Sequence, residues 1–67
     1  MAIAKVSEII ASSDKSFEDA IQLGIARANQ TLKNVKGAWV AEQKVIVEKG
    51  KITEYRVAMR VTFIIED

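Results

Sequence analysis

The chain has 67 residues, of which 49% are hydrophobic, and it contains no Cys, His or Pro. A chain of this length forms one domain at most and buries only roughly 60% of the surface that its unfolded form exposes. Because disulfides and the usual nitrogen and sulfur metal ligands are excluded, we expect oligomerisation to supply the missing stability.

The charges are balanced, with ten Lys and Arg against nine Asp and Glu. Nucleic-acid binding depends on clustered Lys and Arg, so this balance argues against it. No apolar run approaches the roughly 20 residues of a membrane-spanning helix, and the N-terminus has no charged-then-apolar signal sequence. We therefore expect a soluble cytoplasmic protein that binds neither nucleic acid nor a membrane.

Residues 3–11 (IAKVSEIIA) are rich in Ile and Val, which predicts a strand. Ile3 and Ile9 fall on one side of this strand, and Val6 and Ile10 fall on the other. Two apolar faces suggest that a second subunit covers one of them.

A helix is predicted after Ser16, which is a good N-cap because its hydroxyl can accept from the backbone N–H of Asp19. Gly24 lies in the middle of the apolar stripe of this helix and predicts the close approach of a strand. Lys36-Gly37 is expected to end the helix, with Gly37 as a left-handed C-terminal cap. The stripe recurs at helical spacing over about five turns and consists of Phe17, Ala20, Ile21, Gly24, Ile25, Ala28, Leu32 and Val35.

From Lys36 to Asp67 the chain has two long β-type runs, joined by a two-residue turn at Lys49-Gly50. Residues equidistant from this turn are expected to pair, so that Trp39 lies opposite Arg60. The other expected pairs are Val40–Met59, Ala41–Ala58, Glu42–Val57, Gln43–Arg56, Lys44–Tyr55, Val45–Glu54 and Ile46–Thr53.

This pairing divides the hairpin into two faces. The face expected to pack against the helix carries Tyr55, Val57, Met59, Val61, Phe63, Ile65, Val40 and Ile46. The other face carries Trp39, Ala41, Gln43, Val45, Val47, Glu54, Arg56, Ala58, Arg60 and Thr62. Its mixture of aromatic, amide, guanidinium and small apolar groups predicts an interaction surface. Glu42 and Lys44 fall on the core side, which indicates either that the hairpin extends past the helix or that a bulge shifts the register.

Several segments resemble the dodecin family. They are residues 16–35 (SFEDAIQLGIARANQTLKNV, above all AIQLGIARA), 40–43 (VAEQ), 50–63 (GKITEYRVAMRVTF) and the terminal Glu66-Asp67. The resemblance covers essentially the whole chain as a single domain, 1–67. It implies an α+β fold of order β-α-β-β, with a three-stranded antiparallel sheet wrapped on one helix. It also implies a hollow homododecamer, and many dodecins bind flavins between subunits as storage or sequestering proteins and not as enzymes.

The resemblance also points to site residues. In flavin-binding dodecins, a Trp early in the middle strand stacks on the isoalloxazine ring, and a Gln in the last strand hydrogen-bonds its polar edge. The aligned residues here are Gly37 and Arg56. Trp39 lies two residues on, on the same sheet face as Gly37 but displaced by roughly 7 Å along the strand. The pattern Ala38-x-Val40-x-Glu42-Gln43, followed by GKIT and Tyr-Arg, is similar to the branch called calcium dodecins.

The singled-out residues have alternative roles. Trp39 suits a stacking platform for a planar ligand, an interface plug, or a cation–π partner of Arg60. Arg56 suits a donor to a flavin carbonyl or a phosphate, although a salt bridge between subunits is the simpler expectation. Gln43 is expected to form a hydrogen bond between subunits. Calcium would need oxygen donors, and the acids available are Glu8, Asp14, Glu48, Glu66 and Asp67, which form no spaced acidic loop.

We therefore expect non-catalytic binding of a flavin (FMN or riboflavin), or a related planar ligand, at subunit interfaces. The candidate contacts are Trp39, Arg56, Gln43 and Gly37. Catalysis is disfavoured because the chain has no His, no Cys, no Gly-rich phosphate loop and no Ser with a base partner. Two alternatives stay open. One is a flavin-free dodecin-fold assembly with a structural or calcium-binding role, and the other is a small adaptor whose open sheet face binds a protein.

Overall fold

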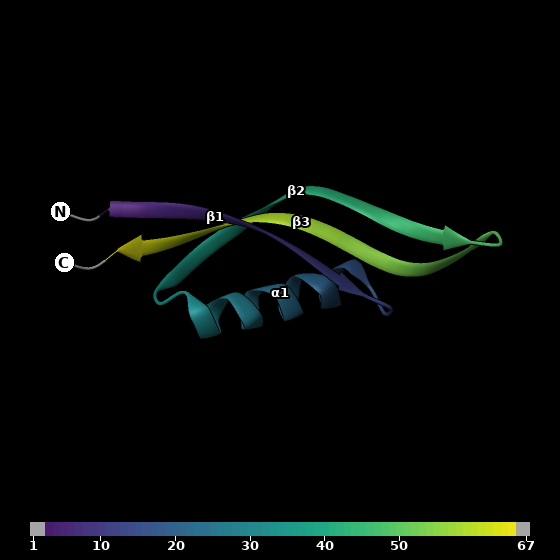
Figure 1. Ribbon diagram of the computed structural model, residues 1–67, viewed down its shortest axis with the longest axis horizontal. Helices are drawn as coiled ribbons and strands as arrows, with labels where there is room; N and C mark the ends of the chain where they lie inside the picture. The colour runs from purple at the N-terminus through teal and green to yellow at the C-terminus, as the bar shows by residue number, and fades with distance from the viewer. Residues whose placement is uncertain (1–2, 66–67) are drawn as a thin grey trace.

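The computed structural model describes residues 3–65, so the expected strand end at Glu66-Asp67 lies outside the described residues. The chain forms β1 (Ile3–Ser13), α1 (Phe17–Thr31), β2 (Val35–Glu48) and β3 (Lys51–Ile65). The strands make one antiparallel sheet of order β1-β3-β2, and α1 lies along one side of it (Figure 1). The expected α+β fold is confirmed, and β1 is two residues longer than predicted because it continues through Ser12 and Ser13.

The helix begins as predicted. The Ser16 hydroxyl accepts from the backbone N–H of Asp19 at 2.9 Å. The Asp19 carboxylate in turn accepts from the hydroxyl of Ser13 at 2.6 Å, and Ser13 also accepts from the backbone N–H of Lys15. Because Ser13 is the last residue of β1, these bonds fix the angle at which the chain leaves the sheet and enters the helix.

The predicted helix end at Lys36-Gly37 is wrong. The helix ends at Thr31, and its C-cap Leu32 has an extended backbone. The left-handed residue is Asn34, with φ 63°, because Asn tolerates this conformation almost as well as Gly. The chain therefore turns earlier, and Val35 and Gly37 belong to β2.

The core lies between α1 and the central strand β3. Its buried apolar residues are Ala20, Ala28, Val57, Met59 and Val61. Gly24 confirms the expected close approach, since a Cβ there would clash with the Met59 methyl group and lie 3.0 Å from the Cβ of Ala11. At the start of the helix, Phe17 packs edge-on against Tyr55, with ring centroids 5.1 Å apart.

The two-residue turn at Lys49-Gly50 is confirmed, with φ 52° and 76°, as a tight hairpin turn of the primed type requires. The pairs Trp39–Arg60 and Val40–Met59 are also confirmed. The other six expected pairs are wrong, because the register shifts between Ile46 and Val47 and again between Val40 and Glu42. Thr53 is the extra residue of the first shift, and Ala41 is the extra residue of the second. The observed pairs between the shifts are Glu42–Ala58, Gln43–Val57, Lys44–Arg56, Val45–Tyr55 and Ile46–Glu54.

The shifts exchange the two faces along this part of β2, because side chains of directly paired residues share a face. Gln43 and Val45 now lie on the helix side, opposite Val57 and Tyr55. Glu42, Lys44 and Ile46 lie on the other side. The bulge interpretation of the misplaced charges is therefore confirmed, and the predicted face is wrong for these five residues. At the far end Ile65, expected in the core, is 41% exposed.

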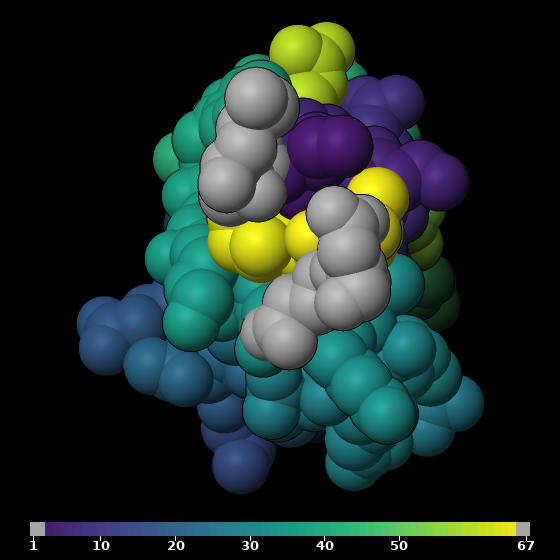
Figure 2. All heavy atoms as spheres, turned by 90° about the vertical axis from the view of Figure 1, so that its left-hand side faces the viewer, coloured from purple at the N-terminus to yellow at the C-terminus, as the bar shows by residue number. Residues whose placement is uncertain are grey.

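The hairpin extends well beyond the helix, so the subunit is elongated, with extents of 52 × 19 × 13 Å (Figure 1). We call residues 46–54 the hairpin arm. The strand β1 pairs with β3 only as far as Tyr55, so the arm consists of two strands alone. Seen end-on, the helix lies on one side of the strands (Figure 2), and within residues 3–65 no further helix or strand covers the opposite side.

Candidate ligand-binding face

The side of the sheet that faces away from α1 is called the outer face here. Three-residue rows cross it from β1 through β3 to β2. The rows are Val6–Thr62–Gly37, Glu8–Arg60–Trp39, Ile10–Ala58–Glu42 and Ser12–Arg56–Lys44. They are uncovered within the subunit, and they hold three of the four predicted site residues.

Trp39 lies at the β2 end of a charged row. The Arg60 guanidinium is 5.6 Å from the centroid of the Trp39 ring, within the range of a cation–π contact. On its other side, Arg60 Nε donates to Glu8 Oε2 at 3.3 Å. The expected Trp39–Arg60 contact is therefore present, and the Trp39 side chain still has 48% of its surface exposed.

Arg56 forms an ion pair within its own strand. Its Nη2 lies 3.1 Å and 3.2 Å from the two carboxylate oxygens of Glu54. Hydrogen bonds from the Ser12 hydroxyl and, second, from Arg56 hold the pKa of the Glu54 carboxyl below its ordinary value of 4.5. The salt bridge that we expected between subunits therefore forms inside one chain, and only Nη2 of the guanidinium takes part in it.

A cavity of about 250 Å³ lies beside Arg56, and its lining residues are Ile10, Glu42, Gln43, Lys44, Arg56 and Ala58. Lys44 faces Arg56 directly across the strands, where like charges repel. Gln43 is not opposite Arg56 as predicted, but it still contributes to the wall of this cavity. No local pattern predicts how β1 pairs with β3, so Ile10 was not expected at this cavity. Lys44 was not expected there because the bulge at Ala41 moves it to the outer face.

Gly37 faces Thr62 on the outer face, and a Cβ at Gly37 would meet no atom within 4 Å. The outer face is therefore open at position 37, one row away from Trp39. Trp39 and Arg56 are not brought together, because Arg60, the partner of Trp39, lies four residue steps along β3 from Arg56, which is roughly 13 Å along a strand. Within one subunit the aromatic ring and the Arg56 cavity form two separate parts of the face.

Among residues 3–65, no group of three or more acids is placed to hold a metal ion. The calcium candidates Glu8, Asp14 and Glu48 are not gathered together, and Glu66 and Asp67 lie outside the described residues. No helix in the described part of the chain is long and apolar enough to cross a membrane.

The chain matches the family model for dodecin over residues 3–66. It is 38% identical to the calcium dodecin of Mycobacterium tuberculosis over 94% of this chain and 89% of that one. It is 31% identical to the dodecin of Thermus thermophilus, over 97% and 94% of the two chains. The solved dodecin from Streptomyces davaonensis superposes with a TM-score of 0.94 at 32% identity, covering 98% and 97% of the chains. The chain therefore belongs to the dodecin family.

Proposed function

From this membership of the dodecin family, we propose that the protein is a non-catalytic homododecamer that binds and sequesters a flavin, or a related planar ligand, at its subunit interfaces. The ligand stacks on Trp39, in the space left open by Gly37. The polar end of the ligand enters the cavity lined by Arg56 and Gln43. This cavity belongs to a neighbouring subunit.

The observation that carries the proposal is the half-exposed Trp39 on an outer face that no other element of residues 3–65 covers. A rigid aromatic ring is a natural platform for a planar heteroaromatic ligand. Arg60 holds the indole from the direction of β3. This contact restrains the ring before a ligand binds, and so reduces the conformational-entropy cost of binding.

A site shared between two subunits would allow Trp39 and Arg56 to contact the same ligand despite their distance within one subunit. The two parts lie too far apart along one sheet to contact the same ring edge, whereas two subunits facing each other can bring them together. The donors available at the polar part are the Arg56 nitrogens outside the Glu54 ion pair, the Gln43 amide and the Lys44 amine. These groups suit carbonyl and phosphate oxygens.

A fluorescence titration with riboflavin and FMN tests this proposal. Trp39 is the only Trp in the chain, so protein emission reports on this residue alone. We expect flavin and Trp39 emission to be quenched together and to saturate at a fixed flavin-to-subunit ratio. A Trp39→Leu variant should weaken binding by about fivefold to 150-fold, since loss of base–aromatic stacking costs about 1–3 kcal/mol. Absence of quenching at micromolar protein would overturn the flavin assignment.

A calcium-binding role is the second candidate, because the relative from Mycobacterium tuberculosis is named calcium dodecin. Outside the Arg56–Glu54 ion pair, the acids that the outer face offers are Glu42, which forms no ion pair within residues 3–65, and the exposed Glu8, which pairs with Arg60. Under this alternative, isothermal titration with Ca²⁺ gives a saturating signal that EDTA removes, and flavin gives none.

A further inference from the structure

One row of the outer face, Glu8–Arg60–Trp39, joins all three strands through side-chain contacts. Glu8 of β1 is paired with Arg60 of β3, which is paired in turn with Trp39 of β2. Arg60 Nε donates to Glu8 Oε2 at 3.3 Å, and the guanidinium lies over the Trp39 ring, 5.6 Å from its centroid. Because both contacts are made by the same guanidinium, the Glu8 carboxylate affects where Arg60 lies relative to the indole.

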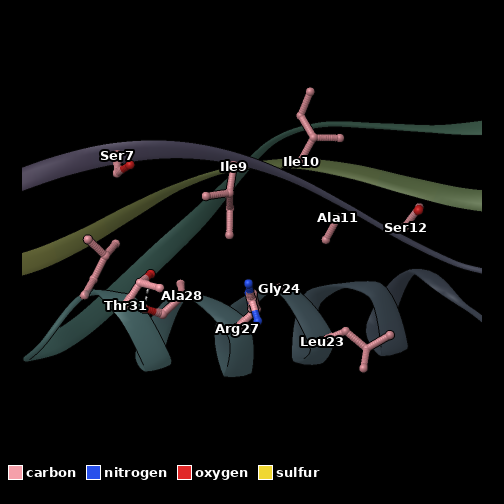
Figure 3. Close-up of a pocket in the computed structure, with 11 residues that line it drawn as sticks. Ser7, Ile9, Ile10, Ala11, Ser12, Leu23, Gly24, Arg27, Ala28 and Thr31 are labelled. Atoms are coloured by element: carbon pink, nitrogen blue, oxygen red, sulfur yellow. Dashed lines mark hydrogen bonds between the residues drawn. The ribbon is translucent and has the colours of Figure 1, made fainter.

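The alternation of side chains along β1 places Glu8 on the outer face. Figure 3 shows Ile9 and Ala11 pointing from β1 toward α1, whereas Ile10 points away from the helix. Side chains alternate between the two faces of a strand, so Glu8 shares the face of Ile10. Its carboxylate therefore lies on the same side of the sheet as the Arg60 guanidinium.

The surroundings of Arg60 allow it to lie across the sheet. Its neighbours on the outer face of β3 are the small residues Ala58 and Thr62. An exposed Arg side chain has many rotamers, and holding it in one of them costs free energy. Among residues 3–65, Glu8 is the acid that forms an ion pair with Arg60. This second contact helps to offset the cost of keeping the guanidinium over Trp39.

We propose that Glu8 acts through Arg60 as a positioning residue for the Trp39 ring. The carboxylate holds the guanidinium over one face of the indole, and the planar ligand stacks on the opposite face. Each Trp39 then offers a single stacking surface, so flavin binding should saturate at no more than one flavin per subunit. This inference rests on the proposed function and adds a residue of β1 to that site.

Acrylamide quenching of Trp39 emission in the ligand-free protein tests the positioning role, because the chain has no other Trp. Glu8→Gln removes the ion pair and Arg60→Gln removes the cation, so each should raise the quenching constant. The double variant should be quenched no more than Arg60→Gln, because Glu8 acts only through Arg60. Additive increases would contradict this order. Glu18→Gln, the same change at an exposed position on α1, is the matched control and should keep the wild-type constant.

Flavin affinity is the second readout. Glu8→Gln and Arg60→Gln should each weaken binding of FMN or riboflavin by about twofold to fivefold, the size expected of a cation–π contact at an exposed site. The Glu8 and Arg60 side chains are 72% and 47% exposed, so both variants should keep the particle mass of wild type in light scattering. Wild-type quenching and wild-type affinity in Glu8→Gln would overturn the inference.

The wild-type chain gives an answer even where a variant fails to assemble. Raising NaCl from about 0.1 M to about 1 M shortens the Debye length from roughly 10 Å to roughly 3 Å, which screens the exposed Glu8–Arg60 pair. Acrylamide quenching of wild-type Trp39 should therefore rise with salt, beyond any change seen for free N-acetyltryptophanamide. A quenching constant that is independent of salt would contradict the role of Glu8.

The outcomes separate this inference from the proposed function. Flavin binding in wild type, together with unchanged quenching in Glu8→Gln, overturns the positioning role and leaves the flavin site standing. Raised quenching in both single variants of a protein that binds no flavin supports the positioning of the ring and overturns only the flavin assignment.

Discussion

Gly24 sets how closely the helix approaches the sheet. Replacement by Ala gains up to about 1 kcal/mol of helix propensity. The added methyl group would clash with the flexible end of Met59 and with the fixed Cβ of Ala11, and overpacking of this kind costs about 1–3 kcal/mol. We therefore expect Gly24→Ala to be destabilising by about 1 kcal/mol in urea denaturation at fixed subunit concentration. Gly37→Ala is the matched control, because its Cβ meets open space, and it should be neutral or slightly stabilising.

Glu54 should make stability sensitive to acid. Ser12 and Arg56 lower the pKa of its carboxyl in the folded protein. A group with a depressed folded pKa contributes stability above its unfolded pKa and loses it as the pH falls through the folded pKa. The thermal midpoint of wild type should therefore fall more steeply below pH 4.5 than the thermal midpoint of Glu54→Gln. Ser12→Ala, which removes the largest cause, should move the decline to higher pH, and identical profiles for all three proteins would contradict this assignment.

The hairpin turn is the element most open to improvement. Lys49 has a positive φ without being Gly or Asn, and Asn-Gly is the preferred pair for this turn. Lys49→Asn should stabilise the protein by several tenths of a kcal/mol. Gly50→Ala, at φ 76°, should destabilise it by about 1 kcal/mol. Thermal midpoints that shift in opposite directions in the two variants would support the turn geometry, and shifts in the same direction would contradict it.

The order of elements could be predicted from the sequence because each has its own period and end signals. Ser16 and Lys49-Gly50 gave the helix start and the hairpin turn correctly. The helix end was predicted wrongly because Gly37 was chosen as the left-handed residue in preference to Asn34. Both residue types tolerate a left-handed backbone.

Register could not be predicted, because one extra residue in a strand reverses every later side chain. Thr53 and Ala41 look ordinary in the sequence, and only the charged Glu42 and Lys44 on the supposed core side signalled a bulge. The row Ser12–Arg56–Lys44 also depends on how β1 pairs with β3, a long-range contact that no local pattern contains. The sequence therefore predicted the Trp39–Arg60 pair but not the neighbours of Arg56.

The whole subunit has too little interior for its apolar content. Nine large hydrophobic residues among those described are exposed, against five buried in the core. If assembly covers them, mass action links folding to association. The thermal midpoint should therefore rise with subunit concentration. A midpoint independent of concentration, in a range where the particle dissociates, would show that the subunit is stable alone.

The arm offers the sharpest test at this scale. Val47 is 55% exposed in the single subunit, so Val47→Asp should cost the isolated fold little. In the assembly the same carboxylate would be buried against apolar surface, which is strongly unfavourable without a partner. We expect light scattering to show smaller species at a concentration where wild type is fully assembled, while circular dichroism keeps the helical signal. Gln22→Asp, an exposed change on the helix, should leave the particle intact. An unchanged particle size in Val47→Asp would show that the arm is not part of a subunit interface, because an aspartate buried there would weaken assembly.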